Sequence, residues 1–157
     1  IMIKFRDIGT YKNCVNVPYC TVPSAITSGV KNGMGVTADL ATKTVALPDA
    51  TTAKGQVYIV MNRIDKPEVF APNDYVIAVG ENPRLFDITS LKNRILDMDM
   101  DAVTTAYASI AVGNTLTLGT DGKWVVNATL TDYKSYLKVT EKTTFGGTGI
   151  AVQVIIA

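Results

Sequence analysis

Residues 112–126 read Val-Gly-Asn-Thr-Leu-Thr-Leu-Gly-Thr-Asp-Gly-Lys-Trp-Val-Val and predict a β-hairpin. In the first half two leucines alternate with threonines, which is the two-residue period of a strand with one buried face. The Asp-Gly pair that follows tolerates the positive φ of a tight hairpin turn. A second β-prone run starts at Lys123 and carries the only tryptophan, Trp124. This hairpin is the strongest structural signal in the chain, and it contains no catalytic motif.

Further short β-prone segments follow the same logic. Residues 33–40 and 43–47 read as two strands joined by a loop. Residues 56–61 form a nearly continuous apolar run, which is typical of a buried central strand. We also expect the end of the chain to be paired in a sheet. The other predicted strands are residues 75–79, 104–112, 136–140 and 150–156.

One helix is predicted, over residues 91–98. Leu91, Ile95 and Met98 fall on one face at helical spacing, and a threonine or serine just before them can cap the first turn. The fold class expected from all of these segments is mainly β. We expect a compact antiparallel β-barrel or sandwich with one short helix and an extended N-terminal arm.

Residues 1–28 differ from the rest of the chain. Apolar residues are punctuated there by Gly9, Pro18 and Pro23, and the prolines interrupt any long strand or helix. The segment reads as an extended arm that lies across its own core or a neighbour, or equally as an edge strand plus coil of the same domain. Residues 29–157 are expected to form a single β-rich domain, since the length fits one hydrophobic core.

A shift of 80 residues aligns the first predicted strands with the opening hairpin. Residues 33–61 then fall on residues 113–141 without a gap, and Val36 meets Leu116. This pattern predicts two related β units, each unable to bury its apolar face alone. The alternative is that unrelated short β units use similar turn residues. The identical positions are Gly33 and Gly113, Thr37 and Thr117, Lys43 and Lys123, Val45 and Val125, Thr51 and Thr131, and Lys54 and Lys134.

The composition narrows the function. Histidine is absent, which removes the usual Ser-His-Asp and Cys-His catalysis and most zinc sites. Cys14 and Cys20 have neither redox-pair nor metal-knuckle spacing. The sequence is compatible with two reduced thiols and with a local disulfide between them. The formal net charge of +1 does not suit nucleic acid, and no apolar run approaches the ~18 residues of a membrane span. We therefore expect no enzyme, no cofactor or metal, no nucleic-acid partner and no membrane partner.

Three motifs resemble ligand-binding sites, and each also has a purely structural interpretation. Asp97, Asp99 and Asp101 alternate as in a calcium loop, but alanine stands where that loop needs glycine and glutamate, so solvated charges at a helix end are favoured. Residues 146–149 are glycine-rich but precede a strand, which favours a hairpin loop over a phosphate cradle. Trp124, with the nearby Tyr133 and Tyr136, suits a sugar-binding platform, or more commonly a core or interface.

Across residues 30–126 the chain resembles the decoration, or cement, proteins of tailed-bacteriophage capsids. The resemblance lies in Gly-Met-Gly-Val-Thr, Lys-Thr-Val-Ala-Leu-Pro-Asp, Gly-Glu-Asn and the opening hairpin stretch, all of which are turn and strand residues. It implies a β protein made in the host cytoplasm and bound to the capsid exterior of the virion. It also implies the major capsid protein as partner, and a homo-oligomer such as a trimer or contacts between neighbouring copies.

The hypothesis is therefore a structural virion protein that bridges major capsid subunits, with part of the contact supplied by the arm. One alternative is a carbohydrate- or receptor-binding module of a fibre or adhesin. Another is a different virion piece, such as a tail or head-completion protein. The arm residues predicted to meet the capsid are Ile3, Phe5, Tyr11, Val15 and Tyr19.

Overall fold

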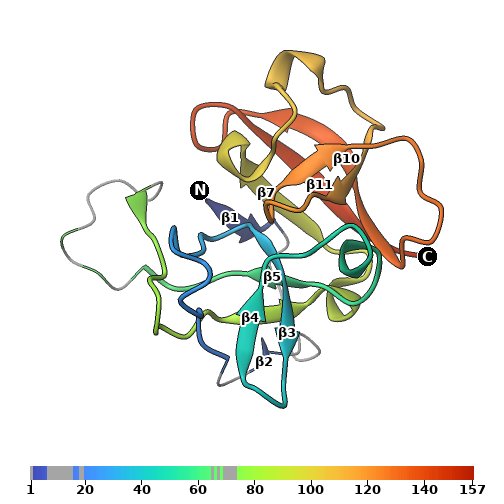
Figure 1. Cartoon of the computed structure of the whole chain (residues 1–157). Coiled ribbons are helices and arrows are strands. Elements are labelled where there is room, and N and C mark those ends of the chain that lie inside the picture. The colour runs from blue at the N-terminus through green and yellow to red at the C-terminus, as the bar shows by residue number, and fades with distance from the viewer. Residues whose placement is uncertain (1, 7–15, 18–19, 65, 67, 69–73) are drawn as a thin grey trace.

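The computed structural model describes residues 2–6, 16–17, 20–64, 66, 68 and 74–157. It shows a mainly β protein with two antiparallel sheets, and its only helical segments are short 3-10 turns within these residues (Figure 1). No helix in the described part of the chain is long and apolar enough to cross a membrane.

The six-stranded sheet contains most of the C-terminal half of the chain and one strand from the N-terminus. The two longest strands of this sheet, β10 and β11, are adjacent and form a hairpin in the middle of the sheet. In spatial order its strands are β1 (Ile3–Phe5), β7 (Ile95–Asp99), β11 (Gly149–Ile156), β10 (Ser135–Thr143), β8 (Thr115–Leu118) and β9 (Trp124–Val126).

The five-stranded sheet is built from the first half of the chain. Its central strand is β5, all three residues of which are buried, as the apolar run at residues 56–61 predicts. Its strands in spatial order are β2 (Asn16–Val17), β6 (Leu85–Asp87), β5 (Tyr58–Val60), β3 (Gly35–Asp39) and β4 (Thr44–Ala46). The 3-10 turns of the chain include η1 (Thr52–Lys54), η3 (Ile88–Leu91), η4 (Met100–Ala102) and η5 (Tyr107–Ser109).

The hairpin predicted for residues 112–126 is confirmed. β8 pairs with β9, with Leu116 opposite Val126 and Leu118 opposite Trp124. Gly122 has a φ of +75°, which is the conformation for which the turn requires glycine. The predicted pair at residues 33–47 is likewise present as β3 and β4, and β11 pairs the end of the chain with β10.

The helix predicted for residues 91–98 is wrong. This region contains the end of η3, a turn at which Asn93 has a φ of +64°, and the start of strand β7. In β7, strand alternation places the buried Leu96 and Met98 on one face, whereas helical spacing had placed Met98 with Ile95, which is only half-buried. The helix prediction also relied on three aspartates as solvated charges at a helix end, but Asp97 and Asp99 are buried in the strand and only Asp101 of the three is exposed.

Two predicted strands are also wrong, and strand β6 was not predicted. Residues 104–112 contain η5 and turns, and residues 75–79 form only an isolated bridge, between Ile77 and Val30. β6 follows directly after a proline-containing loop, and its three residues are too few to show a period. Tertiary pairing with β5 and β2 makes it a strand.

The two sheets share one strand order. If five strands of each sheet are numbered along the chain, their order across the sheet is 1-5-4-2-3. This holds for β2 to β6 and again for β7 to β11, and β1 is added outside β7. The shared strand order covers more of the chain than residues 33–61 and 113–141, and the relation of those two spans as repeated units stays a prediction.

The turns before β3 and β8 match in detail. Gly33 has a φ of +89° and Gly113 a φ of +92°. The N–H of Gly33 donates to the carbonyl of Val60, and the N–H of Gly113 donates to the carbonyl of Val139, both over 2.8 Å. Each following residue accepts a bond in return from the same valine. We call the part of the chain from β2 to β6 the first half and the part from β7 to β11 the second half. At these turns, equivalent positions in the two halves have equivalent backbone geometry.

The core extends between and beside the sheets, and Trp124 is its largest wholly buried side chain. The indole Nε1 donates to the carbonyl of Gly33 over 3.0 Å, which joins the two halves of the chain. The Cβ that an alanine would add at Gly35 falls 2.5 Å from a methyl of Leu118. The close approach of the halves therefore depends on an indole donor from one half and a glycine from the other.

Ser135 is the one described residue whose buried side-chain oxygen has no hydrogen-bond partner. A buried hydroxyl without a partner costs about 1–3 kcal/mol of desolvation. We therefore expect Ser135→Ala to raise the free energy of unfolding by about 1 kcal/mol in urea titrations. Thr117→Val is the control, since Thr117 Oγ1 accepts a bond from Asn127 and its loss should destabilise. Destabilisation by Ser135→Ala would contradict the assignment.

Candidate interaction surfaces

The first segment of the predicted arm is part of the body. β1 pairs with β7, placing Ile3 opposite Met98 and Phe5 opposite Leu96. Directly opposed residues share a face of a sheet, so both apolar side chains point into the core with their neighbours. The Phe5 ring meets the Phe86 ring edge-on, with centroids 5.8 Å apart. Ile3 and Phe5 are therefore half-buried against the core, and their capsid contact stays a prediction.

The rest of the predicted contact lies outside the described residues, namely Tyr11, Val15 and Tyr19. On either side of Tyr11 and Val15 the chain is held by the body, through β1 at the edge of one sheet and β2 at the edge of the other. The N-terminal segment therefore contributes an edge strand to both sheets.

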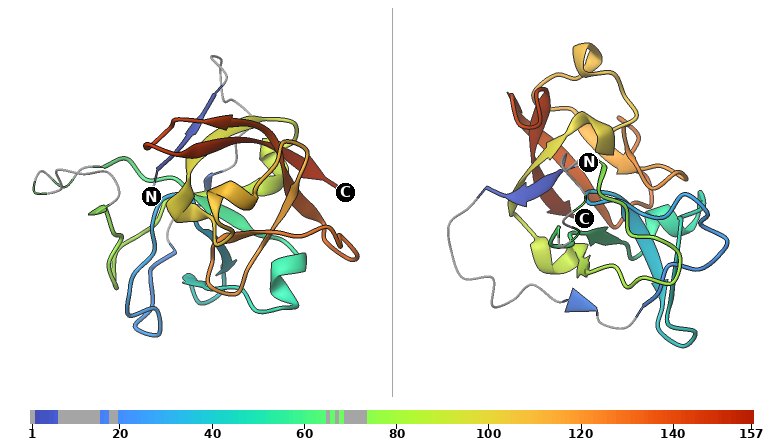
Figure 2. Two further views of the ribbon diagram at one scale, coloured as in Figure 1. Left: turned by 90° about the horizontal axis from the view of Figure 1, so that it is seen from above. Right: turned by 90° about the vertical axis from the view of Figure 1, so that its left-hand side faces the viewer.

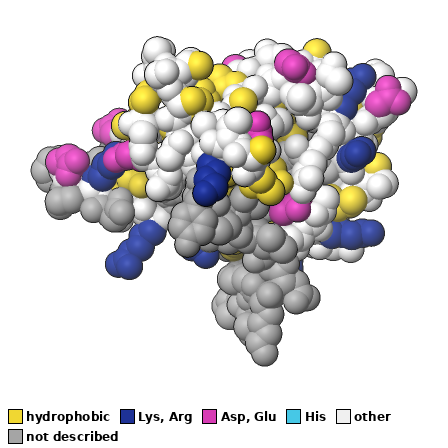
Figure 3. Space-filling view, turned by 60° about the horizontal axis from the view of Figure 1, so that its bottom comes forward, with side chains coloured by type: hydrophobic (Ala, Val, Ile, Leu, Met, Phe, Trp, Pro, Cys, Tyr) yellow, Lys and Arg dark blue, Asp and Glu magenta, His cyan; other side chains and the backbone are white. Residues whose placement is uncertain are grey.

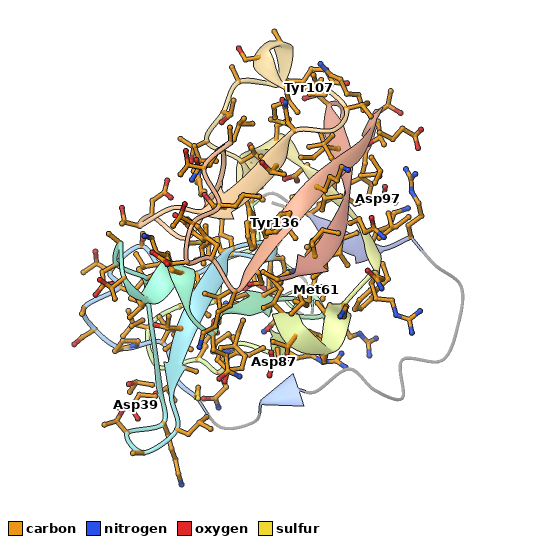
Figure 4. All side chains as sticks on the ribbon, turned by 90° about the vertical axis from the view of Figure 1, so that its right-hand side faces the viewer. Asp39, Met61, Asp87, Asp97, Tyr107 and Tyr136 are labelled. Carbon is orange, nitrogen blue, oxygen red and sulfur yellow. The ribbon has the colours of Figure 1, made fainter. Side chains whose placement is uncertain are left out.

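A charged cluster fastens β1 across the outer face of its sheet. Arg6 donates to Asp97 at 2.9 Å and to Glu141 at 2.5 Å, and it passes over the buried Ala151 that lies between them. The hydrogen bonds that the Arg6 guanidinium donates to the carboxylates of Glu141 and Asp97 raise its pKa. Asp97, at 5 % exposure, is buried as part of this cluster, and its position is visible in Figure 4.

The three alternating aspartates do not come together as a metal site. Asp97 faces Arg6, while Asp99 accepts the backbone N–H groups of Met2 and Asp101. Burial raises the pKa of Asp99, and the N–H bonds oppose that shift only in part. No group of three candidate ligands that could hold a metal ion occurs among the residues the structure describes.

The other sequence motifs have structural places. Trp124 is 0 % exposed, so it packs as the common interpretation predicts and cannot form a sugar platform. Tyr136 lies half-buried on the outer face of β10 (Figure 4). Residues 146–148 lie in the turn between β10 and β11, as expected for a hairpin loop, and Gly149 begins β11. Cys20 is a buried free thiol, and burial raises its pKa, whereas Cys14 lies outside the described residues.

The hollows of the surface are shallow and are lined by ordinary surface residues. One of about 380 Å³ contains two lysines and two aspartates of balanced charge. Another, of about 480 Å³, lies between η1 and the β8–β9 hairpin beside Tyr133. Basic and acidic side chains are interspersed over the face shown in Figure 3. The first hollow is lined by Ser28, Gly29, Lys31, Met34, Asp101, Asp121 and Lys123.

Two exposed apolar turns were missed from the sequence. The hairpin tip, residues 39–43 between β3 and β4, carries Leu40 at 58 % exposure. The apolar turn, residues 106–113 around η5, carries Val112 at 62 % exposure. These are the two most exposed large hydrophobic side chains in the described part of the chain. Single apolar residues in turns give no sequence signal, since only the fold shows that they are uncovered.

Both turns are held rigidly. Lys142 Nζ donates to the carbonyls of Tyr107 and Ile110 at 2.9 and 3.0 Å and lies 4.0 Å from the centre of the Tyr107 ring. In the hairpin tip, Asp39 Oδ1 accepts the N–H groups of Ala41 and Thr42. These bonds lower the pKa of Asp39, because they stabilise the charged carboxylate. Each turn therefore presents a preformed surface.

The loop after β5 is held by a lysine–glutamate pair. Lys66 Nζ donates to Glu81 at 2.7 Å and to the carbonyl of Val76 at 2.9 Å. The bond from Lys66 and a second from the N–H of Ala78 lower the pKa of Glu81 below its ordinary 4.5. Because the folded pKa is depressed, the stabilisation is present above pH 4.5 and lost as the pH falls through the folded pKa.

We therefore expect Glu81→Gln to lower the melting temperature modestly at pH 7. The difference from the unaltered chain should shrink below pH 4.5 and vanish once Glu81 is protonated in the folded state. Melting temperatures measured across pH 2–7 check this. Glu141→Gln serves as a comparison, because its partner Arg6 also binds Asp97. A difference that is independent of pH would contradict the assignment.

Comparison with known proteins adds no relative to this geometry: no family model, curated protein or solved structure matches the chain.

Proposed function

We propose that this chain is a structural virion protein that binds the outer surface of a phage capsid and bridges major capsid subunits. Its two sheets would form a compact sandwich that serves as a rigid body, and no catalytic step is assigned to it. The proposal places the protein on the capsid exterior as a homo-oligomer, a trimer or a set of neighbouring copies.

The observation that supports a scaffold role is that the titratable groups with shifted pKa values stabilise turns, loops and strands. Each described group with a shifted pKa owes the shift to burial or to a structural bond. Asp39 and Asp49 hold turns, Lys66 and Glu81 hold a loop, and Arg6 holds β1. Shifted groups that converge on a cleft would instead suggest chemistry. The turn and strand residues of residues 30–126 add the resemblance to capsid decoration proteins.

The mechanism would be additive contact. A stable interface needs on the order of 1,000 Å² of buried surface. A rigid body loses little conformational freedom when it binds, and many identical copies on a shell multiply a modest affinity. The apolar arm residues would extend the buried area beyond that of the body.

The test is binding to purified, expanded shells of the major capsid protein, with occupancy counted by imaging of the particles. We expect the unaltered chain to occupy fixed positions on the outer surface. A chain altered at Tyr11, Val15 and Tyr19 to alanine should show reduced occupancy with unchanged folding, because Ile3 and Phe5 still anchor β1 in the core. The matched control carries alanine at the exposed Thr27, Thr51 and Thr131.

Absence of the unaltered chain from the shell would overturn the proposed function. Undiminished occupancy of the arm variant would instead overturn only the arm contact. The burial of Trp124 removes the aromatic platform on which the carbohydrate-binding alternative depended.

A further inference from the structure

The two halves of the chain meet where a turn of the first half contacts a hairpin of the second half. The equivalent turn of the second half does not contact the equivalent hairpin of the first. The turn before β3 lies against the hairpin of the second half: Gly35 donates to the carbonyl of Gly122 over 2.8 Å, and Trp124 donates to Gly33. Since the halves share one strand order, the second half has an equivalent of that turn, and the first half has an equivalent of that hairpin. These equivalents are the turn that contains Val112 and the hairpin tip that contains Leu40.

The two equivalents do not meet within one chain. η5 and the apolar turn lie at the top of the molecule in Figure 1, and the tip of the β3–β4 hairpin lies at the bottom. The other views agree: Tyr107 and Asp39 are at opposite ends in Figure 4, and the right-hand view of Figure 2 has the same separation. The halves are thus joined head to tail, which leaves the apolar turn at one end and the hairpin tip at the other. The base of the tip is held by Thr21, which donates to the carbonyl of Lys43, and Leu40 at its end is exposed.

We propose that copies of this chain associate head to tail, with the hairpin tip of one copy docked on the apolar turn of the next. The contact repeats between chains the turn-against-hairpin arrangement that joins the halves within a chain. It buries Leu40 and Val112, the most exposed large hydrophobic side chains of the described residues. In detail the new contact differs from the internal one, because Thr44 stands at the position equivalent to Trp124.

The chemistry of the two surfaces suits this occupant. No charged residue occurs from Ala102 to Thr120, and the ammonium that rests on the apolar turn, Lys142 Nζ, is already bonded to two of its carbonyls. The charges of the hairpin tip, Asp39 and Lys43, flank Leu40 and are exposed at its base. A Cβ at Gly113 would meet no atom within 4 Å, so the approach to the turn is open. Lys142 and Asp39 hold the two surfaces in place beforehand, which reduces the ordering cost of association.

A head-to-tail contact uses different patches on the two partners, so it closes into a ring or continues as a chain. A contact of this size is expected to be weak in solution and to act through repetition on an array. The proposed function includes a homo-oligomer, and this inference names the surfaces through which its copies would bind. It does not otherwise rest on the proposed function.

The first test uses complementation between two variants. Leu40→Asp places a carboxylate in the hairpin tip, and Val112→Asp places one in the apolar turn. Each should weaken self-association by at least about tenfold, as measured by sedimentation at up to about 1 mM protein. An equal mixture should form a one-to-one dimer, because the intact tip of one variant fits the intact turn of the other. Ile64→Asp, at an exposed site in another loop, is the control and should associate like the unaltered chain.

The second test is cross-linking in a Cys14→Ser background, where the remaining Cys20 is buried. Mixed Leu40→Cys and Val112→Cys chains should form a disulfide between the two variants in preference to like pairs. Thermal unfolding confirms that each variant is folded.

An unaltered chain that stays monomeric up to about 1 mM would overturn the inference, as would a mixture of the two aspartate variants that fails to dimerise. A preference for like-with-like cross-links would do the same, because it indicates a two-fold contact. A chain that is monomeric in solution yet occupies capsid shells would overturn this inference and leave the proposed function standing.

Discussion

Replacing Trp124 by alanine is expected to lower the free energy of unfolding by about 3–5 kcal/mol, the range for removing a large buried aromatic side chain. The indole is 0 % exposed and joins the halves of the chain through its bond to Gly33. Alanine would leave a cavity and an unpaired carbonyl at the same place. Urea titration followed by far-UV circular dichroism measures the loss, and a chain with no stable fold in buffer is the extreme of the same result.

Trp124→Phe separates the two contributions. Phenylalanine keeps most of the apolar volume but cannot donate to the carbonyl of Gly33, so about 1–2 kcal/mol of the loss should remain. If the phenylalanine variant is as stable as the unaltered chain, the hydrogen bond between the halves does not contribute to stability.

Gly122→Ala is expected to destabilise by about 2–5 kcal/mol, from two sources. The φ of +75° costs a residue with a side chain about 1–2 kcal/mol. The added Cβ would also fall 2.8 Å from Met34 Cε and 3.0 Å from the carbonyl oxygen of Gly35, and crowding of this kind typically costs about 1–3 kcal/mol. The backbone of Gly35 cannot move aside easily, because it is bonded to Gly122 itself.

Gly113→Ala is the matched control for that prediction. Gly113 has a φ of +92°, but its added Cβ would meet no atom within 4 Å. Only the backbone cost should remain, and the difference between the two alanine variants measures the packing between the halves. Equal losses in the two variants would show that the contact between the halves tolerates the extra atom.

The sequence alone determined the local β structure wherever pattern and turn chemistry agreed. The alternation at Leu116 and Leu118 with the Asp-Gly turn predicts the hairpin, and the apolar run around Ile59 predicts a central buried strand. The match between Gly33 and Gly113 likewise indicated related turns. These features depend on neighbours in the chain, so a single sequence carries them.

Only the tertiary structure decided which faces are buried and which ends are free. β7 is a strand because β1 and β11 pair with it on both sides. Its Asp97 is buried under Arg6, and its Asp99 is buried where it accepts the N–H groups of Met2 and Asp101. Ile3 and Phe5 read as arm residues, but pairing at the sheet edge packs them, half-buried, against the core. Leu40 and Val112 are exposed because each half of the chain covers only one end of the other. Such relations join residues far apart in the chain, and local pattern contains no information about them.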